Sequence, residues 1–482
     1  MEGSVDIAIV PYYTPVVRQL MGTLLIRNAS LLATFDGQRR ELHDAALFAR
    51  DGIIEQIDST EKLHLEADEI LDLRGHVVLP GLINTHHHFY QTLTRAVPAG
   101  QNANLFNWLK ILYPIWARLT PDDIYVSTQT ALAELALSGC TTAADHLYLF
   151  PNGARLDNEI EAAREIGLRL HASRGSMSVG ESQGGLPPDS IVEDEDFILA
   201  ECRRLVEVYH DEQPGAMTQI VLAPCSPFSV SPNLMKETVE LAREYKVNLH
   251  THLAETKDEE EYTQERFGMR PVAWMETLGW VGDDVWYAHS VHVNDEEIDL
   301  YAARGCGVAH CPTSNMRLAS GIAPIAKMVT AGVKVGLGVD GSASNDSSHM
   351  LAEARQAMLV SRLDAGLRGV SLSQGSGGEL MSARQALELA TRGGASILGR
   401  DDIGSLEVGK CADFAAFDMN QLDYAGALHD PLAALVFCSP ARADYTVVGG
   451  RFIVREGELQ TMELGKVIEK HNQAAGRLVR GD

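Results

Sequence analysis

Histidines spaced two residues apart occur twice in the chain. His86 and His88 lie in "NTHHHFYQ", and His250 and His252 lie in "HTHLAE". Side chains alternate across a β-strand, so residues i and i+2 face the same way and the two imidazoles of a pair can hold one cation. His87 would then point to the opposite side. Because histidine clusters are also common on protein surfaces, one such pair does not by itself establish a metal site.

Three further polar residues extend this pattern. His289 lies in "YAHSVH", Asp340 lies in "GVDGSASND", and Glu255 follows His252 by three residues. Taken singly, a buried histidine is usually just hydrogen-bonded, and an aspartate before glycine is usually a turn residue. Together, several imidazoles and a carboxylate with a position left for water are typical of a hydrolytic Zn²⁺ or Fe²⁺ centre.

A repeated strand–helix pattern would position these residues. Short apolar or β-branched runs alternate with longer segments of helical spacing, which indicates eight strand–helix units and a (β/α)8 barrel. The polar residues cluster at the C-terminal ends of the runs, which is the face that carries chemistry in this fold. The runs are "GLINTHHH", "GCTTAADH", "GLRLHASR", "QIVLAPCS", "VNLHTHLAE", "VWYAHSVH", "GVAHCP" and "VKVGLGVDG".

The two ends of the chain have a different character. Residues 22–80 and 400–465 read as short strands, with hairpin signals at Asp51-Gly52 and Gly449-Gly450. We expect these ends to pair into one small β domain, flanking a barrel over 81–399 and followed by a helical tail over 466–482. Residues 1–21 form an apolar leader without a basic start, so we expect no signal peptide there and assign it no function.

The amino-acid composition limits which binding partners and which cellular compartment we expect. The formal net charge is −26, which argues against nucleic acid and against an anionic membrane as partners. The seven cysteines are scattered without a C-x-x-C pair, which disfavours a disulfide framework and favours a reducing, cytoplasmic compartment. The acidic balance says little about a small neutral substrate.

Several motifs together resemble the amidohydrolase superfamily, in its branch of mononuclear deaminases and triazine hydrolases. They are "PGLINTHHH", "HTHLAE", "YAHSVH", "HCPTSN", "GVDGSASND" and "GSLEVGKCADFAAFD". The resemblance covers nearly the whole chain from about Met21. It implies a distorted (β/α)8 TIM barrel with a small β-sandwich domain built from both termini. Such barrels often pair, so a homodimer is a further expectation.

The resemblance also implies a metal site and roles for its residues. By motif position, one divalent metal, Zn²⁺ before Fe²⁺, would be held by His86, His88, His252 and Asp340. Asp340 would also accept the proton of the attacking water, Glu255 would donate a proton to the ring nitrogen, and His289 would polarise the reacting group. His250 matches no ligand position and is interpreted as structural. Binuclear relatives carry a carboxylated lysine in the fourth run; "QIVLAPCS" has none, which favours one metal.

Two residues point to a purine-like substrate. Gln91 occupies the place where guanine deaminases carry a glutamine, although a solvent-facing glutamine is an equal alternative. Cys225 stands where those enzymes supply an arginine. A thiol or thiolate accepts a hydrogen bond, which suits the N7–H of 8-oxoguanine, whereas arginine has only donors and suits guanine. The alternative is that Cys225 is a small buried apolar residue.

Three more residues are candidates for substrate binding. Trp108 could stack on a flat heterocycle, although most aromatic residues at helical spacing belong to the core. His146 and Arg174 end the second and third runs on the chemical face, and a structural salt bridge explains Arg174 equally well.

The sequence thus predicts deamination of an aminated heterocycle, most of all 8-oxoguanine to urate and ammonia. The alternative is hydrolysis of an alkylamino- or hydroxy-triazine, such as removal of ethylamine from hydroxydechloroatrazine. Guanine or cytosine deamination and a non-catalytic scaffold are weaker alternatives.

Overall fold

The computed structural model describes residues 22–369 and 380–481, so the leader at 1–21 lies outside the described residues. Eight parallel strands close into a barrel in the order β10-β11-β12-β13-β14-β15-β8-β9. All eight runs expected from the sequence form these strands, which confirms the barrel. Their bounds are β8 (Leu82–Asn84), β9 (Cys140–Leu147), β10 (Arg169–Ser176), β11 (Thr218–Pro224), β12 (Leu249–Leu253), β13 (Val285–His289), β14 (Gly307–His310) and β15 (Lys334–Leu337).

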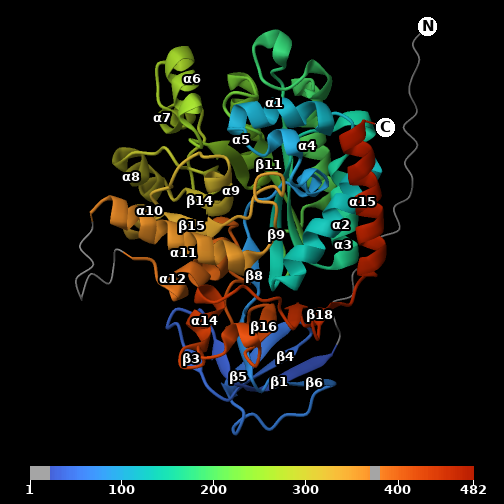
Figure 1. Cartoon of the computed structure of the whole chain (residues 1–482), viewed down its shortest axis with the longest axis vertical. Helices are drawn as coiled ribbons and strands as arrows, with labels where there is room; N and C mark the ends of the chain where they lie inside the picture. The colour runs from blue at the N-terminus through green and yellow to red at the C-terminus, as the bar shows by residue number, and fades with distance from the viewer. Residues whose placement is uncertain (1–21, 370–379, 482) are drawn as a thin grey trace.

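Helices surround the barrel and cover its outer face (Figure 1). Their starts follow local chemistry: α2 begins with Pro121 after a reciprocal Thr120–Asp123 capping box, and Ser231 caps α5. The helices are α1 (Leu105–Trp116), α2 (Pro121–Leu137), α3 (Leu156–Ile166), α4 (Glu195–Tyr209), α5 (Pro232–Tyr245), α6 (Lys257–Phe267), α7 (Pro271–Thr277), α8 (Asp295–Arg304), α9 (Pro312–Arg317), α10 (Ile325–Ala331), α11 (Met350–Leu367), α12 (Ala383–Glu388) and α13 (Gly394–Ile397).

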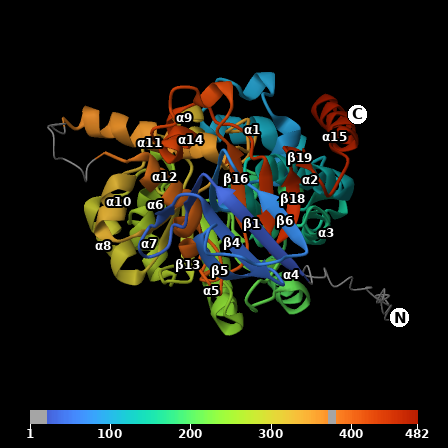
Figure 2. The same ribbon diagram turned by 90° about the horizontal axis from the view of Figure 1, so that it is seen from below.

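Both ends of the described chain contribute to a β domain below the barrel (Figures 1 and 2). One sheet has the order β5-β4-β1-β6 and the other β19-β18-β17-β16-β7-β2-β3. The two ends meet where β7 pairs antiparallel with β16. The strands are β1 (Thr23–Ala29), β2 (Leu31–Ala33), β3 (Glu41–Leu42), β4 (Ala45–Arg50), β5 (Ile53–Ser59), β6 (Glu69–Asp72), β7 (His76–Pro80), β16 (Phe414–Asp418), β17 (Tyr445–Val448), β18 (Arg451–Arg455) and β19 (Glu458–Leu459).

Both expected hairpins are present. Asp51 and Gly52 have φ angles of 50° and 81°, and Gly449 and Gly450 have 53° and 78°. Positive φ at both central residues is the signature of the type I′ turn, whose twist matches the flanking strands. These turns fix the register of β4 with β5 and of β17 with β18.

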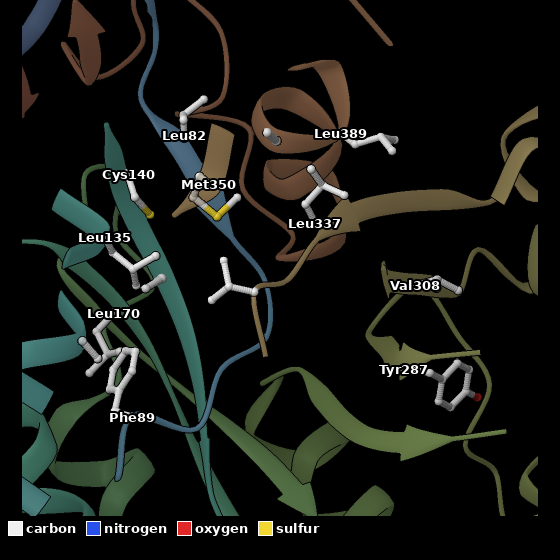
Figure 3. Packing of buried hydrophobic residues seen from close by; sticks show 14 of the residues in the cluster. Leu82, Phe89, Leu135, Cys140, Leu170, Tyr287, Val308, Leu337, Met350 and Leu389 are labelled. Carbon is white, nitrogen blue, oxygen red and sulfur yellow. The ribbon is translucent and has the colours of Figure 1, made fainter. Parts of the chain in front are cut away.

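The barrel core joins strands to helices, as Figure 3 shows. Leu135 of α2 and Met350 of α11 pack in the same cluster as Cys140, Leu170 and Leu337 of the barrel strands, and all five are fully buried. This packing fixes the strand ends, and therefore the positions of the side chains that follow them.

The remaining helices lie at the chain's C-terminal side. They are α14 (Pro431–Phe437) and α15 (Leu464–Arg480), and α15 runs along α2 and the short 3-10 helix η1 (Phe89–Thr94) (Figures 1 and 2).

The division of the chain into domains stays a proposal: a β domain from 22–80 with 400–465, a barrel over 81–399 and a helical tail over 466–482. In the described ranges, no helix combines the length and apolar character needed to cross a membrane.

Candidate metal centre and active site

Three imidazoles and one carboxylate converge at the C-terminal mouth of the barrel. His86 and His88 follow β8, His252 lies on β12, and Asp340 follows β15. The Nε2 atoms of His86 and His88 each lie 3.3 Å from Asp340 Oδ1. His88 Nε2 lies 3.1 Å from His252 Nε2. The structure thus brings together all four residues expected to hold the metal.

The protonation of these rings fits a cation. His88 Nδ1 lies 2.7 Å from the carbonyl oxygen of His146, and His252 Nδ1 lies 2.7 Å from that of Cys225. A carbonyl only accepts, so both Nδ1 atoms carry the proton. Burial lowers the pKa of His88 and lowers that of His252 to about 3, so both rings are neutral and each Nε2 presents a lone pair. Two lone pairs facing each other at 3.1 Å repel unless a cation lies between them.

His86 and Asp340 complete the donor set. His86 Nε2 is buried and has no hydrogen-bond partner among the described residues, as expected of a metal-binding nitrogen. Burial alone would raise the pKa of Asp340, but the adjacent imidazoles of His86, His289 and His88 hold that pKa well below its usual range. A carboxylate and three imidazole nitrogens form the donor set that a hydrolytic divalent metal prefers.

Two further side chains face this centre. His289 Nε2 lies 3.6 Å from Glu255 Oε2 and 3.9 Å from Asp340 Oδ2. Burial raises the pKa of Glu255, which favours a protonated carboxyl that can donate. Burial opposes protonation of His289, yet its interactions with Glu255 and Asp340 raise its pKa overall. These positions allow proton transfer beside the metal centre.

Backbone strain is concentrated at two of these residues. His289 has a φ of 72° and Asp340 a φ of 62°, in the left-handed region that non-glycine residues rarely adopt. Such conformations cost of order 1–3 kcal/mol each and persist where the surroundings impose them. Both residues stand where their strands end, so the bend turns each side chain toward the barrel mouth.

Gln91 lies in the cavity beside the metal centre and does not face solvent, so that alternative is wrong. Its side chain is 1% exposed, and Oε1 has no hydrogen-bond partner in the part of the chain that the structure describes. A Cβ atom at Gly341 would lie 1.9 Å from Gln91 Oε1, so any larger residue there would displace the amide from its present position. The amide is therefore buried with a free acceptor.

Other cavity residues give the site a flat, largely apolar wall. Trp108 lines the cavity, and its Nε1–H donates to Ala343 O at 3.2 Å. Cys225 is 6% exposed, and burial raises the pKa of its thiol to about 12, so it faces the cavity as a neutral thiol. The cavity is also lined by Leu105, Leu109, Tyr113, Tyr148, Ser226, Phe228, Leu318 and Ser344.

The other two candidates for substrate binding, Arg174 and His146, do not line this cavity. Arg174 forms a bidentate ion pair with Glu193, with both distances 2.9 Å, and lies over the ring of Phe150, which favours the salt-bridge alternative. His146 stacks on His252, and its Nε2–H donates to Ala223 O at 2.7 Å. It therefore belongs to the histidine cluster, because one ring nitrogen of His146 lies within 4.8 Å of nitrogens of His86 and His252.

Three supporting residues escaped the sequence interpretation. Glu259 accepts hydrogen bonds from the backbone N–H groups of Ala254 and Glu255, at 2.9 and 3.1 Å. Asn315 Oδ1 lies 2.9 Å from His289 Nδ1, and Ser320 donates to Glu255 Oε1 at 3.0 Å. Asn315 was visible in "HCPTSN", and Glu259 lies one helical turn after Glu255; Ser320 gives no signal in the sequence.

A larger cavity of about 800 Å³ lies near the start of β15, between α12, α13 and the β domain. Among the described residues that line it, there is no histidine and none of the predicted site residues. The candidate catalytic residues therefore line the smaller cavity at the barrel mouth and not this one.

Comparison with known proteins agrees with this geometry. The model of the amidohydrolase family matches residues 77–453. The chain is 48% identical over 466 residues to an 8-oxoguanine deaminase of Pseudomonas aeruginosa, covering 96% of this chain and 100% of that protein. It is 39% identical over 422 residues to a hydroxydechloroatrazine ethylaminohydrolase of Pseudomonas sp. (strain ADP), covering 86% and 85%. The structure of an atrazine chlorohydrolase from Arthrobacter aurescens TC1, complexed with zinc, superposes with a TM-score of 0.87 at 34% identity, covering 94% and 100%.

Proposed function

This chain belongs to the amidohydrolase family and is a hydrolase of carbon–nitrogen bonds, and we propose that it deaminates 8-oxoguanine to urate and ammonia with one divalent metal. Zn²⁺ is the metal we favour, with Fe²⁺ as the alternative, because the donor set suits both. The observation that supports the metal is the pair of facing lone pairs at His88 and His252, 3.1 Å apart beside the Asp340 carboxylate.

The proposed metal would be held by His86, His88, His252 and Asp340. Bound there, it would supply a Lewis acid that lowers the pKa of a water molecule toward neutrality. Asp340 is an ionised carboxylate and accepts a proton from that water.

Glu255 and His289 complete the proton transfers that we propose. Glu255 is a buried carboxyl with a raised pKa, so it donates a proton to the ring nitrogen as the amino-bearing carbon becomes tetrahedral. Its backbone is held by Glu259 and its carboxylate by Ser320. His289 hydrogen-bonds the attacking oxygen, in a ring orientation set by Asn315. Asp340 or Glu255 then carries a second proton to the amino group, which leaves as ammonia as its bond to the tetrahedral carbon breaks.

The substrate assignment rests on the cavity and on the relative. The match spans the full length of the 8-oxoguanine deaminase. Gln91 offers a buried amide with a free oxygen, and a purine edge carries both donors and acceptors. The Cys225 sulfur is a weak acceptor, which tolerates the N7–H of 8-oxoguanine better than an arginine would.

Triazine hydrolysis is the second candidate. Its support is the similarity to the ethylaminohydrolase and to the triazine hydrolase structures, together with an aromatic cavity wall that suits any flat heterocycle. The non-catalytic scaffold finds no support, because every predicted ligand and proton-transfer position is filled and assembled. We also propose a cytoplasmic location, with a small heterocycle as partner.

One panel separates these functions. Purified protein is analysed for metal, loaded with zinc, and offered 8-oxoguanine, guanine, isocytosine, cytosine and hydroxylated ethylamino-triazines, with ammonia and ethylamine measured separately. We expect about one metal per chain and fastest ammonia release from 8-oxoguanine. Faster ethylamine release from a triazine would replace the first candidate with the second. Absence of both metal and turnover would reject both.

A further inference from the structure

His250 lies on β12, where it pairs with Trp286 of β13, and it is buried beside the candidate metal centre without lining the cavity. Its Nδ1 lies 2.9 Å from the carbonyl oxygen of Trp286, so this nitrogen carries the proton. A neutral imidazole has only one ring proton, which leaves His250 Nε2 as an acceptor. That atom lies 2.8 Å from Nδ1 of His86.

The acceptor on His250 determines the tautomer of His86. Because His250 Nε2 has no proton to give, His86 Nδ1 must donate, and His86 Nε2 is left with its lone pair toward Asp340. Among the four proposed ligands, the rings of His88 and His252 are oriented by backbone carbonyls. The ring of His86 is instead oriented by a side chain, that of His250, which a substitution can remove.

Trp286 holds His250 in place. Its indole stacks on the His250 ring with centroids 4.6 Å apart and planes 18° apart, and its Nε1–H donates to Thr85 O at 3.2 Å. Trp286 thus contacts His250 with its ring and its own carbonyl, and also fixes the backbone residue before His86. The ring of His250 cannot rotate without breaking these contacts.

We infer that His250 is a positioning residue that fixes the His86 tautomer through the chain Trp286 C=O, His250 and His86. This inference rests on the metal centre of the proposed function. It replaces the interpretation of His250 as merely structural, because partners that orient a ligand histidine contribute to metal affinity.

The test compares zinc affinity of metal-stripped variants by chelator competition. His250→Leu removes the acceptor, and we expect its zinc dissociation constant to rise about 10–100-fold. His250→Gln keeps an acceptor oxygen, so its constant should stay within about threefold of wild type. His171→Leu is the matched control, since His171 is equally buried in β10 and neither of its ring nitrogens has a partner in the described ranges. Wild-type affinity in His250→Leu would overturn the inference.

Neutron diffraction from deuterated wild-type crystals tests the same point without a variant, should His250→Leu fail to fold. We expect deuterium on Nδ1 of both His86 and His250 and none on His250 Nε2. Deuterium on His250 Nε2 would overturn the inference while leaving the metal centre intact. A wild-type protein that binds no zinc would instead reject the proposed function itself, and this inference with it.

Discussion

At the scale of single residues, the proposed chemistry depends on which protons each buried side chain holds. Neutral imidazoles and the ionised Asp340 form the metal side of the site, whereas Glu255 is held toward its protonated form by burial. The pKa values of these two carboxyl groups are shifted in opposite directions because Asp340 contacts three imidazoles, whereas Glu255 has only that of His289 beside it. Asp340 can therefore accept a proton in the proposed reaction, and Glu255 can donate one.

The role of Glu255 gives the first prediction. Glu255→Gln keeps the shape of the side chain but cannot deliver a proton, so kcat should fall about 10²–10⁴-fold while zinc content stays unchanged. Steady-state ammonia release and metal analysis on the same preparation measure both. Glu261→Gln, on the exposed side of α6, is the control and should retain activity. Wild-type turnover in Glu255→Gln would remove this residue from the reaction.

The choice between purines gives the second prediction. Cys225→Arg places donors toward N7, which should favour guanine and disfavour 8-oxoguanine by about tenfold or more in relative kcat/KM. Cys225→Ala separates loss of the thiol from gain of the guanidinium. If the arginine variant keeps the wild-type ratio of the two substrates, Cys225 does not read the purine and is a core residue.

At the scale of elements, a strand and a helix meet through two buried carboxyl groups. Asp145 of β9 accepts the backbone N–H of Phe89 at 2.6 Å, next to His88, and interacts with the buried carboxyl group of Glu159 in α3. Burial raises the pKa of Asp145 to about 8 and, with the Asp145 charge, raises that of Glu159 well above its usual range. The folded pair therefore keeps protons at pH values where the unfolded chain has already released them.

This pair makes stability fall as pH rises. A carboxyl with a raised folded-state pKa stabilises the fold below its unfolded pKa and loses that contribution through the folded pKa, at up to about 1.4 kcal/mol per pH unit. Glu159→Gln lets an amide donate to Asp145, so its stability should fall less between pH 5 and 8 than that of wild type. Urea unfolding at several pH values measures this, with exposed Glu161→Gln as control. Parallel curves for wild type and Glu159→Gln would contradict the account.

The sequence patterns predicted the secondary-structure elements better than the contacts between individual side chains. Each barrel strand was visible because it is a short apolar run between helical segments, and the proposed metal ligands were visible because they lie at the ends of those runs. The Arg174–Glu193 ion pair was not, because Glu193 lies in an irregular segment whose path no periodicity specifies. The burial of Gln91 depends on the close approach of Gly341, which only the closed barrel creates.

At the scale of the whole molecule, a buried ion pair joins the barrel to the β domain. Arg169 at the start of β10 bonds both oxygens of Asp413, at 2.6 and 2.9 Å, and the side chains are 2% and 3% exposed. Asp413 also accepts the N–H of Gly449 in the β17–β18 turn. The pair thus connects the closed end of the barrel to strands from the far end of the chain.

Breaking this pair should cost far more than breaking an exposed one. Arg169→Met leaves Asp413 buried without its cation, and we expect a loss of about 3–5 kcal/mol in the free energy of unfolding. Lys327→Met removes the exposed pair with Asp295 and should cost about 1 kcal/mol or less. Chemical denaturation of both variants measures the difference. Equal losses would show that the Arg169–Asp413 contact does not stabilise the junction.

The central claim is that one divalent metal at the barrel mouth makes this chain an 8-oxoguanine deaminase. The most direct measurement titrates zinc into metal-free protein while following ammonia and urate formed from 8-oxoguanine. We expect both products to rise together and to level off near about one zinc per chain. Activity that ignores added metal, or no ammonia from 8-oxoguanine at saturating zinc, would contradict it.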